Sequence, residues 1–274
     1  MWCAHEDWEG VSRELTAIAG FERHAFAWVA ATGSTNDDLK PVWLEGDGPP
    51  RLLVAGHQTR GRGRLGRAWY DEPRRSLLFS FCWEWPLALL EECVLNPALL
   101  AGLAVHAAVQ RLGASEVTLK WPNDVMSGRR KLAGILVETA PRGESLRGII
   151  GIGINVQPFA APRSISEGTG GAGRMPVSLH ELGMEGLSGP QVLTAVLIAW
   201  GALVGRWMDH ALLEEARRAG RDFFGIPHAL RLPDGTEMRG IPLDLVPPGG
   251  KLLFQAESGE RLLVTGAHSL ERLD

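Results

Sequence analysis

The run from Gln58 to Trp69 constrains this chain more than any other segment, because it predicts an ordered loop between two apolar strands. Four arginines alternate with three glycines, and a tryptophan closes the run. Glycine lets backbone N–H groups come close to a ligand, and arginine carries a fixed charge on a planar fork that fits carboxylate or phosphate. We therefore expect this arginine–glycine loop (58–69) to wrap a small anion, which places the function at a small-molecule site.

Three other interpretations of the loop compete with this one. Gly61, Gly63 and Gly66 have the GxGxxG spacing of dinucleotide sites, but such a site needs a helix directly after the glycines, and Pro73 soon interrupts any helix. RGG-type nucleic-acid segments are usually repeated and disordered, whereas this run occurs once. A solvated basic turn would not need three glycines between its charges. The anion loop is the interpretation that these comparisons favour.

The composition argues against several classes of protein. The chain has 274 residues, enough for one large domain or for a large and a small one. Its net charge of -4 gives no bulk attraction for nucleic acid or an anionic membrane. Three cysteines without metal-ligand spacing argue against a disulfide framework, and the N-terminus lacks a signal-peptide pattern. We expect a cytoplasmic protein that binds neither nucleic acid nor a membrane.

Periodicity and turn residues predict two regions, 1–224 and 225–274. Helices are expected at 11–19, 34–43, 97–112, 178–182 and 190–210, with 211–221 extending or following the last one. Strands are expected at 26–31, 51–56, 76–85, 117–121, 132–139 and 148–156. The segment 157–174 is rich in glycine, alanine, proline and serine and predicts a mobile loop. From Gly225 onward, short apolar runs alternate with turn residues, which is typical of hairpins and of a small β-barrel.

A second motif runs from Lys120 to Asp124, directly after a predicted strand. A lysine in that place is often a solubility charge on an edge strand. Trp121 and Pro122 beside it favour an enclosed site instead. A partly desolvated ammonium group can hold a carboxylate and a phosphate together and stabilise the charge that develops between them.

Two further motifs have an ordinary structural explanation beside the functional one. Gly151 and Gly153 inside a predicted strand indicate close approach of a ligand or of another backbone, and Asn155 offers both a donor and an acceptor. A β-bulge ending in a turn asparagine explains the same residues. A helix N-cap explains 34–36. No metal or nucleophile set emerges, because the eight histidines are scattered.

Taken in this order, the motifs resemble those of the biotin–protein ligases. The matching segments are 34–36, 58–69, 120–124, 131–136 and 151–155. The resemblance covers about residues 26–270, because the C-terminal β segment is similar to the family's small SH3-like domain. It implies an α+β fold with a mixed sheet flanked by helices, akin to class II aminoacyl-tRNA synthetases. It also implies a small C-terminal SH3-like β-barrel.

The resemblance further implies a two-step reaction with biotin and Mg²⁺-bound ATP. Biotin becomes biotinyl-5′-AMP, and a lysine of a biotin carboxyl carrier domain then accepts the biotin. Catalysis is assigned to Lys120 and Arg64. The residues assigned to biotin are Ser34, Thr35, Asn36, Gln58, Arg62, Gly63, Arg64, Lys120 and Gly134, and those assigned to the nucleotide are Arg62, Arg64, Lys120 and Asn155. The resemblance leaves the metal ligands open.

Other functions remain in competition at this stage. A lipoate or octanoate ligase shares the catalytic architecture, although the arginine–glycine loop and the 120–124 motif favour biotin. An NAD-binding oxidoreductase would need a helix after Gly66, and a module that only binds would leave the charged loop unexplained. The N-terminal segment is too short for the helix-turn-helix domain of the family's repressors, so we expect no repressor role. The family is compatible with a homodimer.

Overall fold

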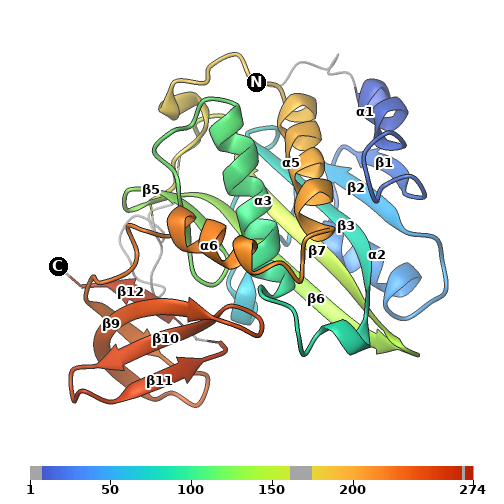
Figure 1. The fold of residues 1–274 in the computed structure, drawn as a ribbon. Helices are drawn as coiled ribbons and strands as arrows, with labels where there is room; N and C mark the ends of the chain where they lie inside the picture. The colour runs from blue at the N-terminus through green and yellow to red at the C-terminus, as the bar shows by residue number, and fades with distance from the viewer. Residues whose placement is uncertain (1–7, 161–174, 267–268, 274) are drawn as a thin grey trace.

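The computed structural model describes residues 8–160, 175–266 and 269–273, which form two sheets (Figure 1). The larger sheet has seven strands in the order β1-β2-β3-β7-β6-β5-β4. In it, β1 and β2 are parallel, and the other neighbours are antiparallel. Its strands are β1 (Ala25–Val29), β2 (Arg51–Ala55), β3 (Ser76–Pro86), β4 (Thr118–Lys120), β5 (Asp124–Ser127), β6 (Arg130–Arg142) and β7 (Ser145–Asn155).

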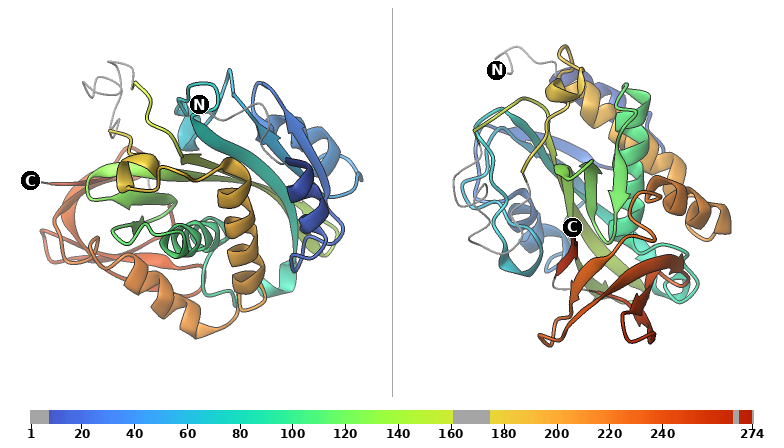
Figure 2. Two further views of the ribbon diagram at one scale, coloured as in Figure 1. Left: turned by 90° about the horizontal axis from the view of Figure 1, so that it is seen from above. Right: turned by 90° about the vertical axis from the view of Figure 1, so that its left-hand side faces the viewer.

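Helices cover both faces of this mixed sheet, so the expected α+β architecture is confirmed (Figures 1 and 2). One face is covered by α2, which contacts β2, β3 and β7, and the other by α3 and α5, which pack together. On the second face, α1 packs against α5, and α6 packs against α3. The helices are α1 (Trp8–Leu15), α2 (Thr35–Trp43), α3 (Pro97–Arg111), α5 (Gly189–Val204) and α6 (His210–Ala219), with short 3-10 turns η1 (Arg64–Gly66), η2 (Leu87–Leu89) and η3 (His180–Leu182).

Side-chain alternation along the central strands divides the core into two parts. On β3, Phe79 and Phe81 join the large core cluster that also contains residues of α3 and α5. Cys82, the residue after Phe81 on β3, joins a smaller cluster with Trp43 of α2. Because successive strand residues point to opposite faces, Ser80 lies on the same side as Cys82. The face beneath α2 is therefore the one on which the polar and glycine positions of the central strands are found.

The helix boundaries follow local capping residues. Asn96 accepts hydrogen bonds from the first turn of α3 with Pro97 at its first position, and Ser188 forms a capping box with Gln191 at α5. The helix predicted for 190–210 ends earlier than expected, because the chain leaves α5 after Val204. The helix expected to extend or follow it at 211–221 follows it as α6. Asp209 caps that second helix by accepting from the backbone of Ala211 at 2.9 Å.

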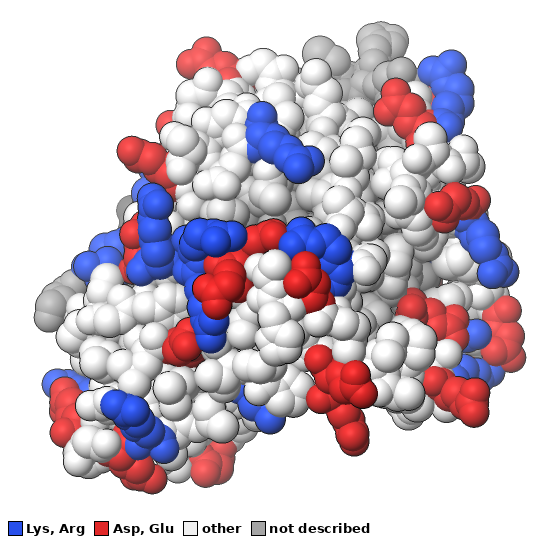
Figure 3. Space-filling model, in the orientation of Figure 1, with Lys and Arg blue, Asp and Glu red and all other residues white. Residues whose placement is uncertain are grey.

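The smaller sheet contains five strands in the order β11-β10-β9-β8-β12 and packs below α6 at one end of the molecule (Figures 1 and 2). Its antiparallel hairpins are those expected from the C-terminal sequence, although the boundary at 224/225 stays a prediction. Over α6, acidic and basic side chains lie beside one another (Figure 3), as in the Arg217–Asp244 ion pair that joins α6 to β9 at 2.5 Å. The strands are β8 (His228–Arg231), β9 (Glu237–Val246), β10 (Lys251–Ala256), β11 (Arg261–Val264) and β12 (Ser269–Arg272).

Other expectations need smaller corrections. The short strand β5 was not expected, since the 120–124 motif and the turn after it conceal it in the sequence. The predicted mobile loop at 157–174 lies largely outside the described residues. None of the helices in the described segments combines the length and the apolar character needed to cross a bilayer.

Candidate active site

Three glycines on β6 and β7 form a floor beneath α2. Gly134 pairs with Gly153, and Gly151 lies two residues along β7 on the same face. A Cβ at Gly151 would lie 2.2 Å from Asn36 Oδ1, and one at Gly153 would lie 2.7 Å from the Trp69 ring. These side chains therefore reach the sheet only because the glycine floor (Gly134, Gly151 and Gly153) has no side chains of its own.

The β-bulge explanation for this part of β7 is wrong. The register of β7 against both β3 and β6 runs without a shift from Gly151 to the end of the strand. The bulge in this region lies instead where β5 meets β6, between Val125 and Met126. The groups that approach the two glycines closely are side chains, Asn36 at Gly151 and Trp69 at Gly153, and not the ligand or second backbone that was expected.

A buried hydrogen-bond network joins the start of α2 to the arginine–glycine loop. Ser34, Thr35 and Asn36 are each 3% exposed. Gln58 Oε1 accepts from the Thr35 backbone N–H at 2.7 Å and from its hydroxyl at 2.9 Å. Ser80 Oγ lies 2.6 Å from the Thr35 hydroxyl and donates to Asn36 Oδ1 at 2.6 Å. Ser34 occupies the N-cap position, yet its side chain makes no capping bond, so the cap explains this motif only in part.

The arginine–glycine loop folds back on itself as a narrow hairpin. The backbone N–H of Trp69 donates to Gly61 at 2.9 Å, and that of Gly63 donates to Arg67 at 2.6 Å. The tip is the η1 turn, where Leu65 and Gly66 have φ values of 58° and 74°. No α-helix follows the glycines, so the strand–turn–helix of a dinucleotide site is not formed. The hairpin returns Trp69 to the glycine floor.

Lys131 is the lysine that the structure brings to this floor. Its Nζ lies 2.6 Å from Asp124 Oδ1 and 5.4 Å from the centre of a Trp69 ring. A Cβ at Gly134 would lie 2.8 Å from the Lys131 Nζ. The sequence analysis placed Lys131 at the start of the matched segment 131–136 but assigned it no role in the site. The signal for such a role was that this lysine leads straight into an apolar strand containing the matched Gly134.

Lys120, which was expected to be the main catalytic cation, lies at the end of β4 as predicted. Its Nζ donates a hydrogen bond of 2.5 Å to the backbone carbonyl of Leu270 in β12. Lys120 therefore joins the large sheet to the small one. Its role in catalysis stays a prediction, and the hydrogen bond to Leu270 gives it a structural role as well.

Two arginines of the loop reach different partners. Arg64 Nη1 donates to Asn123 Oδ1 at 3.3 Å, which brings the loop to the 120–124 motif. Burial lowers the pKa of Arg64, and the nearby Asp124 carboxylate acts in the opposite direction. Arg62 instead forms ion pairs with Asp37 of α2 and with Glu138 of β6. Arg64 thus lies on the side of Lys131, whereas Arg62 closes the loop against α2.

Glu138 lies on the α2 side of the floor and forms ion pairs with the basic side chains there. It accepts from Lys40 Nζ at 2.8 Å and from Asn36 Nδ2 at 2.9 Å. Burial raises the pKa of Glu138, but the hydrogen bonds of Lys40 and Asn36 and the charge of Arg62 outweigh burial and hold the pKa below its ordinary value. Its carboxylate thereby stays ionised and fixes the orientation of Asn36.

Asn155 is buried at the end of β7 rather than open to a ligand. Its Nδ2 donates to the backbone carbonyls of Lys131 at 3.0 Å and Val177 at 3.2 Å, and its Oδ1 accepts from Ser76 at 3.4 Å. These bonds fix the backbone from which the Lys131 side chain extends. The expected place of Asn155 on the nucleotide side stays a prediction.

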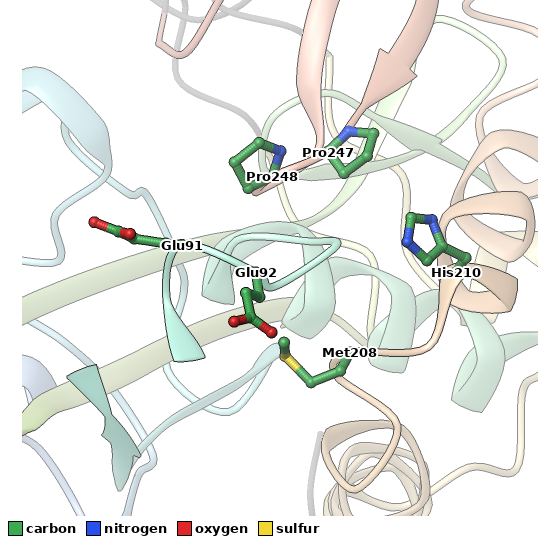
Figure 4. A pocket seen from close by; sticks show the side chains of 6 residues that line it. All are labelled: Glu91, Glu92, Met208, His210, Pro247 and Pro248. Carbon is green, nitrogen blue, oxygen red and sulfur yellow. The ribbon is translucent and has the colours of Figure 1, made fainter. Parts of the chain in front are cut away.

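Other groups of reactive side chains lie apart from this site. The buried thiols Cys82 and Cys93 have pKa values raised by burial, Cys82 to about 11, which suits core residues better than nucleophiles. Among the described residues, no group of three or more histidine, cysteine or acidic side chains could hold a metal ion. A hollow at the junction of the two sheets shares no residue with the glycine floor (Figure 4); it is lined by Glu91, Glu92, Met208, His210, Pro247 and Pro248.

Comparison with known proteins decides the family. The model of the biotin/lipoate A/B protein ligase family matches residues 30–155, which include the glycine floor, the arginine–glycine loop and Lys131. A biotin--[acetyl-CoA-carboxylase] ligase of Mycobacterium tuberculosis is 32% identical over 260 residues, covering 89% of this chain and 88% of the relative. The chain belongs to the biotin–protein ligases.

Solved and curated members of the family agree with this assignment. A biotin protein ligase from Aquifex aeolicus, solved in complex with biotin and ATP, superposes with a TM-score of 0.71 and 27% identity, covering 90% of this chain and 99% of that one. A bifunctional ligase/repressor of Escherichia coli is 38% identical over 104 residues, which are 38% of this chain and 32% of the relative. The resemblance inferred from the motifs is confirmed.

Proposed function

We propose that this chain activates biotin with ATP to form biotinyl-5′-AMP and then transfers the biotin to a lysine of a biotin carboxyl carrier domain. It is a biotin–protein ligase by family, and a relative of almost equal extent is a biotin--[acetyl-CoA-carboxylase] ligase. The observation that carries the proposal is the placement of Lys131, Arg64 and Trp69 around a side-chain-free floor. A lipoate or octanoate ligase is not favoured, because the relatives named above act on biotin.

The first step needs positive charge in an enclosed place. A biotin carboxylate oxygen attacks the α-phosphorus of ATP, a C–O–P bond forms, and pyrophosphate leaves. Both partners are anions, so their repulsion must be screened and the charge developing on the phosphoryl oxygens stabilised. Lys131 and Arg64 supply fixed cations beside the floor. The Mg²⁺ of this step enters with ATP as part of the substrate, as in other phosphoryl-group reactions.

The remaining floor contacts suit the uncharged part of biotin. The Trp69 ring itself lies on Gly134 and Gly153, so we place an apolar slot of the kind that binds a ring between the Trp69 ring and the α2 end of the floor. Thr35, Asn36 and Gln58 supply donors and acceptors at its α2 end. We assign biotin to this slot, with Arg62 and Gly63 in the loop that covers it.

The second step requires that water stay away from a reactive anhydride. The ε-amine of the acceptor lysine attacks the biotinyl carbonyl, an amide forms, the amine loses a proton, and AMP leaves. A loop that covers the intermediate until the acceptor arrives limits hydrolysis. The arginine–glycine hairpin has the position for that task, since it bridges from α2 to the 120–124 motif. The compartment and a homodimer stay predictions.

The proposal is tested by incubating the protein with Mg²⁺-ATP and biotin, lipoate or octanoate in turn, and measuring pyrophosphate. Release with biotin alone is the expected result, and adding a carrier domain should then give a biotinylated lysine. Equal or faster release with lipoate would reverse the choice of substrate. Titration calorimetry with biotin, with and without ATP, gives the order of binding.

A further inference from the structure

A histidine–aspartate pair outside the glycine floor crosslinks the two arms of the arginine–glycine loop. His57 immediately precedes the loop, and Asp71 follows Trp69 by two residues. His57 Nδ1 lies 2.9 Å from Asp71 Oδ2. The Asp71 side chain is 1% exposed and that of His57 is 28% exposed. A carboxylate so deeply buried, held by a partly exposed imidazole and by the backbone of Gln58, is not explained by the reaction chemistry.

The pair fills a gap in the backbone pairing of the loop. Farther from the tip, the Arg74 N–H donates to the Gly56 carbonyl at 2.8 Å. Nearer the tip, the Trp69 N–H donates to the Gly61 carbonyl at 2.9 Å. His57 and Asp71 lie between these two bonds, one on each arm. There the first arm pairs with Thr32 instead of with the second arm, since the Thr32 N–H donates to the His57 carbonyl at 3.0 Å. The side-chain contact therefore joins the two arms where the first arm's backbone is paired elsewhere.

Each arm carries one wall of the biotin slot. The first arm continues from His57 to Gln58, whose side chain binds Thr35. The second arm reaches Asp71 from Trp69, whose ring lies on Gly134 and Gly153. A change in the spacing of the arms therefore changes the spacing of the two walls.

Burying the Asp71 carboxylate costs free energy, and its contact with His57 offsets part of that cost. Its Oδ1 is buried without a hydrogen-bond partner among the described residues. Burial raises the pKa of Asp71, and the hydrogen bond and charge of His57 act in the opposite direction. A buried polar atom that is retained at such a cost often belongs to a functional part of a protein.

We propose that His57 and Asp71 form a clasp that positions Gln58 and Trp69 over the glycine floor and so sets the affinity for biotin, without contacting it. The inference rests on the proposed function, since it assigns biotin to the slot. Because these two residues act through Gln58 and Trp69, they are positioning residues: they change KM for biotin and the retention of the adenylate, and they leave the chemical step nearly intact.

The test compares His57→Phe, Asp71→Ala and the double variant in steady-state pyrophosphate release. Each single change should raise KM for biotin about fivefold to tenfold, the effect of roughly one broken contact, with kcat within about twofold of the wild type. KM for biotin in the double variant should be no higher than in the more impaired of the two single variants. Labelling of a bystander protein should rise in parallel, because biotinyl-AMP escapes.

Conservative and matched variants separate positioning from general damage. Asp71→Asn keeps an acceptor for His57 Nδ1–H and should restore most of the biotin affinity. Glu72→Gln removes the neighbouring carboxylate on the same arm, and His210→Gln removes a histidine of α6; both should behave as the wild type. If Asp71→Ala does not fold, His57→Phe carries the test, since that side chain is partly exposed.

Distinct outcomes overturn distinct claims. An unchanged KM in folded His57→Phe, a fall in kcat at constant KM, or additive effects in the double variant would each refute the clasp. A wild-type protein that releases no pyrophosphate with biotin and Mg²⁺-ATP would refute the proposed function, whatever the variants do.

Discussion

At the scale of single residues, two lysines of similar sequence context have different surroundings. Lys131 lies against Trp69 and Asp124 beside the glycine floor. Lys120 Nζ reaches the backbone of the second sheet at Leu270. Lys120 ends the short strand β4, Lys131 lies near the start of the long strand β6, and each is the first residue of a segment matched by the family. Residue type alone therefore does not separate them. The direction of the side chain does.

We expect Lys131→Met to lower the rate of biotinyl-AMP formation by about 100-fold or more, because a preorganised cation is lost where charge develops. Methionine keeps the length of the side chain against Trp69. Lys120→Met should have the smaller effect on this rate, and pyrophosphate release measures both. The reverse order would return the main catalytic role to Lys120.

A second residue-scale prediction concerns Glu138, whose folded-state pKa is lowered. A lowered carboxyl pKa contributes stability above the unfolded-state pKa, and that contribution is lost as pH falls through the folded value. Glu138→Gln should therefore be less stable by about 1–3 kcal/mol near neutral pH, the range for hydrogen bonds to a charged group. The difference should shrink in acid. Urea denaturation at several pH values checks this, and a difference independent of pH would contradict it.

At the scale of elements, the site depends on two strands whose glycines permit close packing. A Cβ at Gly153 would lie 2.7 Å from the Trp69 ring. Gly153→Ala should push this ring off the floor and so reduce the volume of the slot by a small amount. We therefore expect KM for biotin to rise roughly tenfold. Gly186→Ala, where a Cβ meets nothing within 4 Å, is the matched control. Equal KM values in the two variants would show that biotin does not use this slot.

At the scale of the whole molecule, the second sheet is tied to the first by polar contacts as well as by packing. Trp121 Nε1 donates to the Gly250 carbonyl at 3.1 Å, and Asn96 Nδ2 donates to the Gly249 carbonyl at 2.9 Å. Asn96 also caps α3 through Ala98 and Leu99. One side chain thereby serves a helix end and the junction between the sheets.

Asn96→Ala should lose both of these contributions, about 1–2 kcal/mol for the cap and about 1 kcal/mol for the added hydrogen bond. Ser188→Ala removes the capping side chain at α5 and should lose only the contribution of a cap. Thermal or urea denaturation of both variants measures the difference. Equal losses would mean that the contact with Gly249 adds nothing to stability.

Much of the fold could be predicted because the governing rules are local. Proline after Asn96 begins a helix, paired turn residues mark the C-terminal hairpins, and glycines between arginines exclude a regular element. The end of α5 was placed too late because Trp207 and Met208 continue its apolar pattern while the backbone has already left the helix.

The family and the architecture could be inferred from the sequence alone, whereas anion binding by the arginine–glycine loop stays a prediction. Only the tertiary structure decided which lysine lies on the floor, that Asn155 holds a backbone, and that His57 meets Asp71. The physical reason is the range of the interactions. Propensity, capping and turn chemistry act within a few residues, whereas the direction of a lysine ammonium or the burial of a carboxylate depends on segments that meet only when the sheet is assembled.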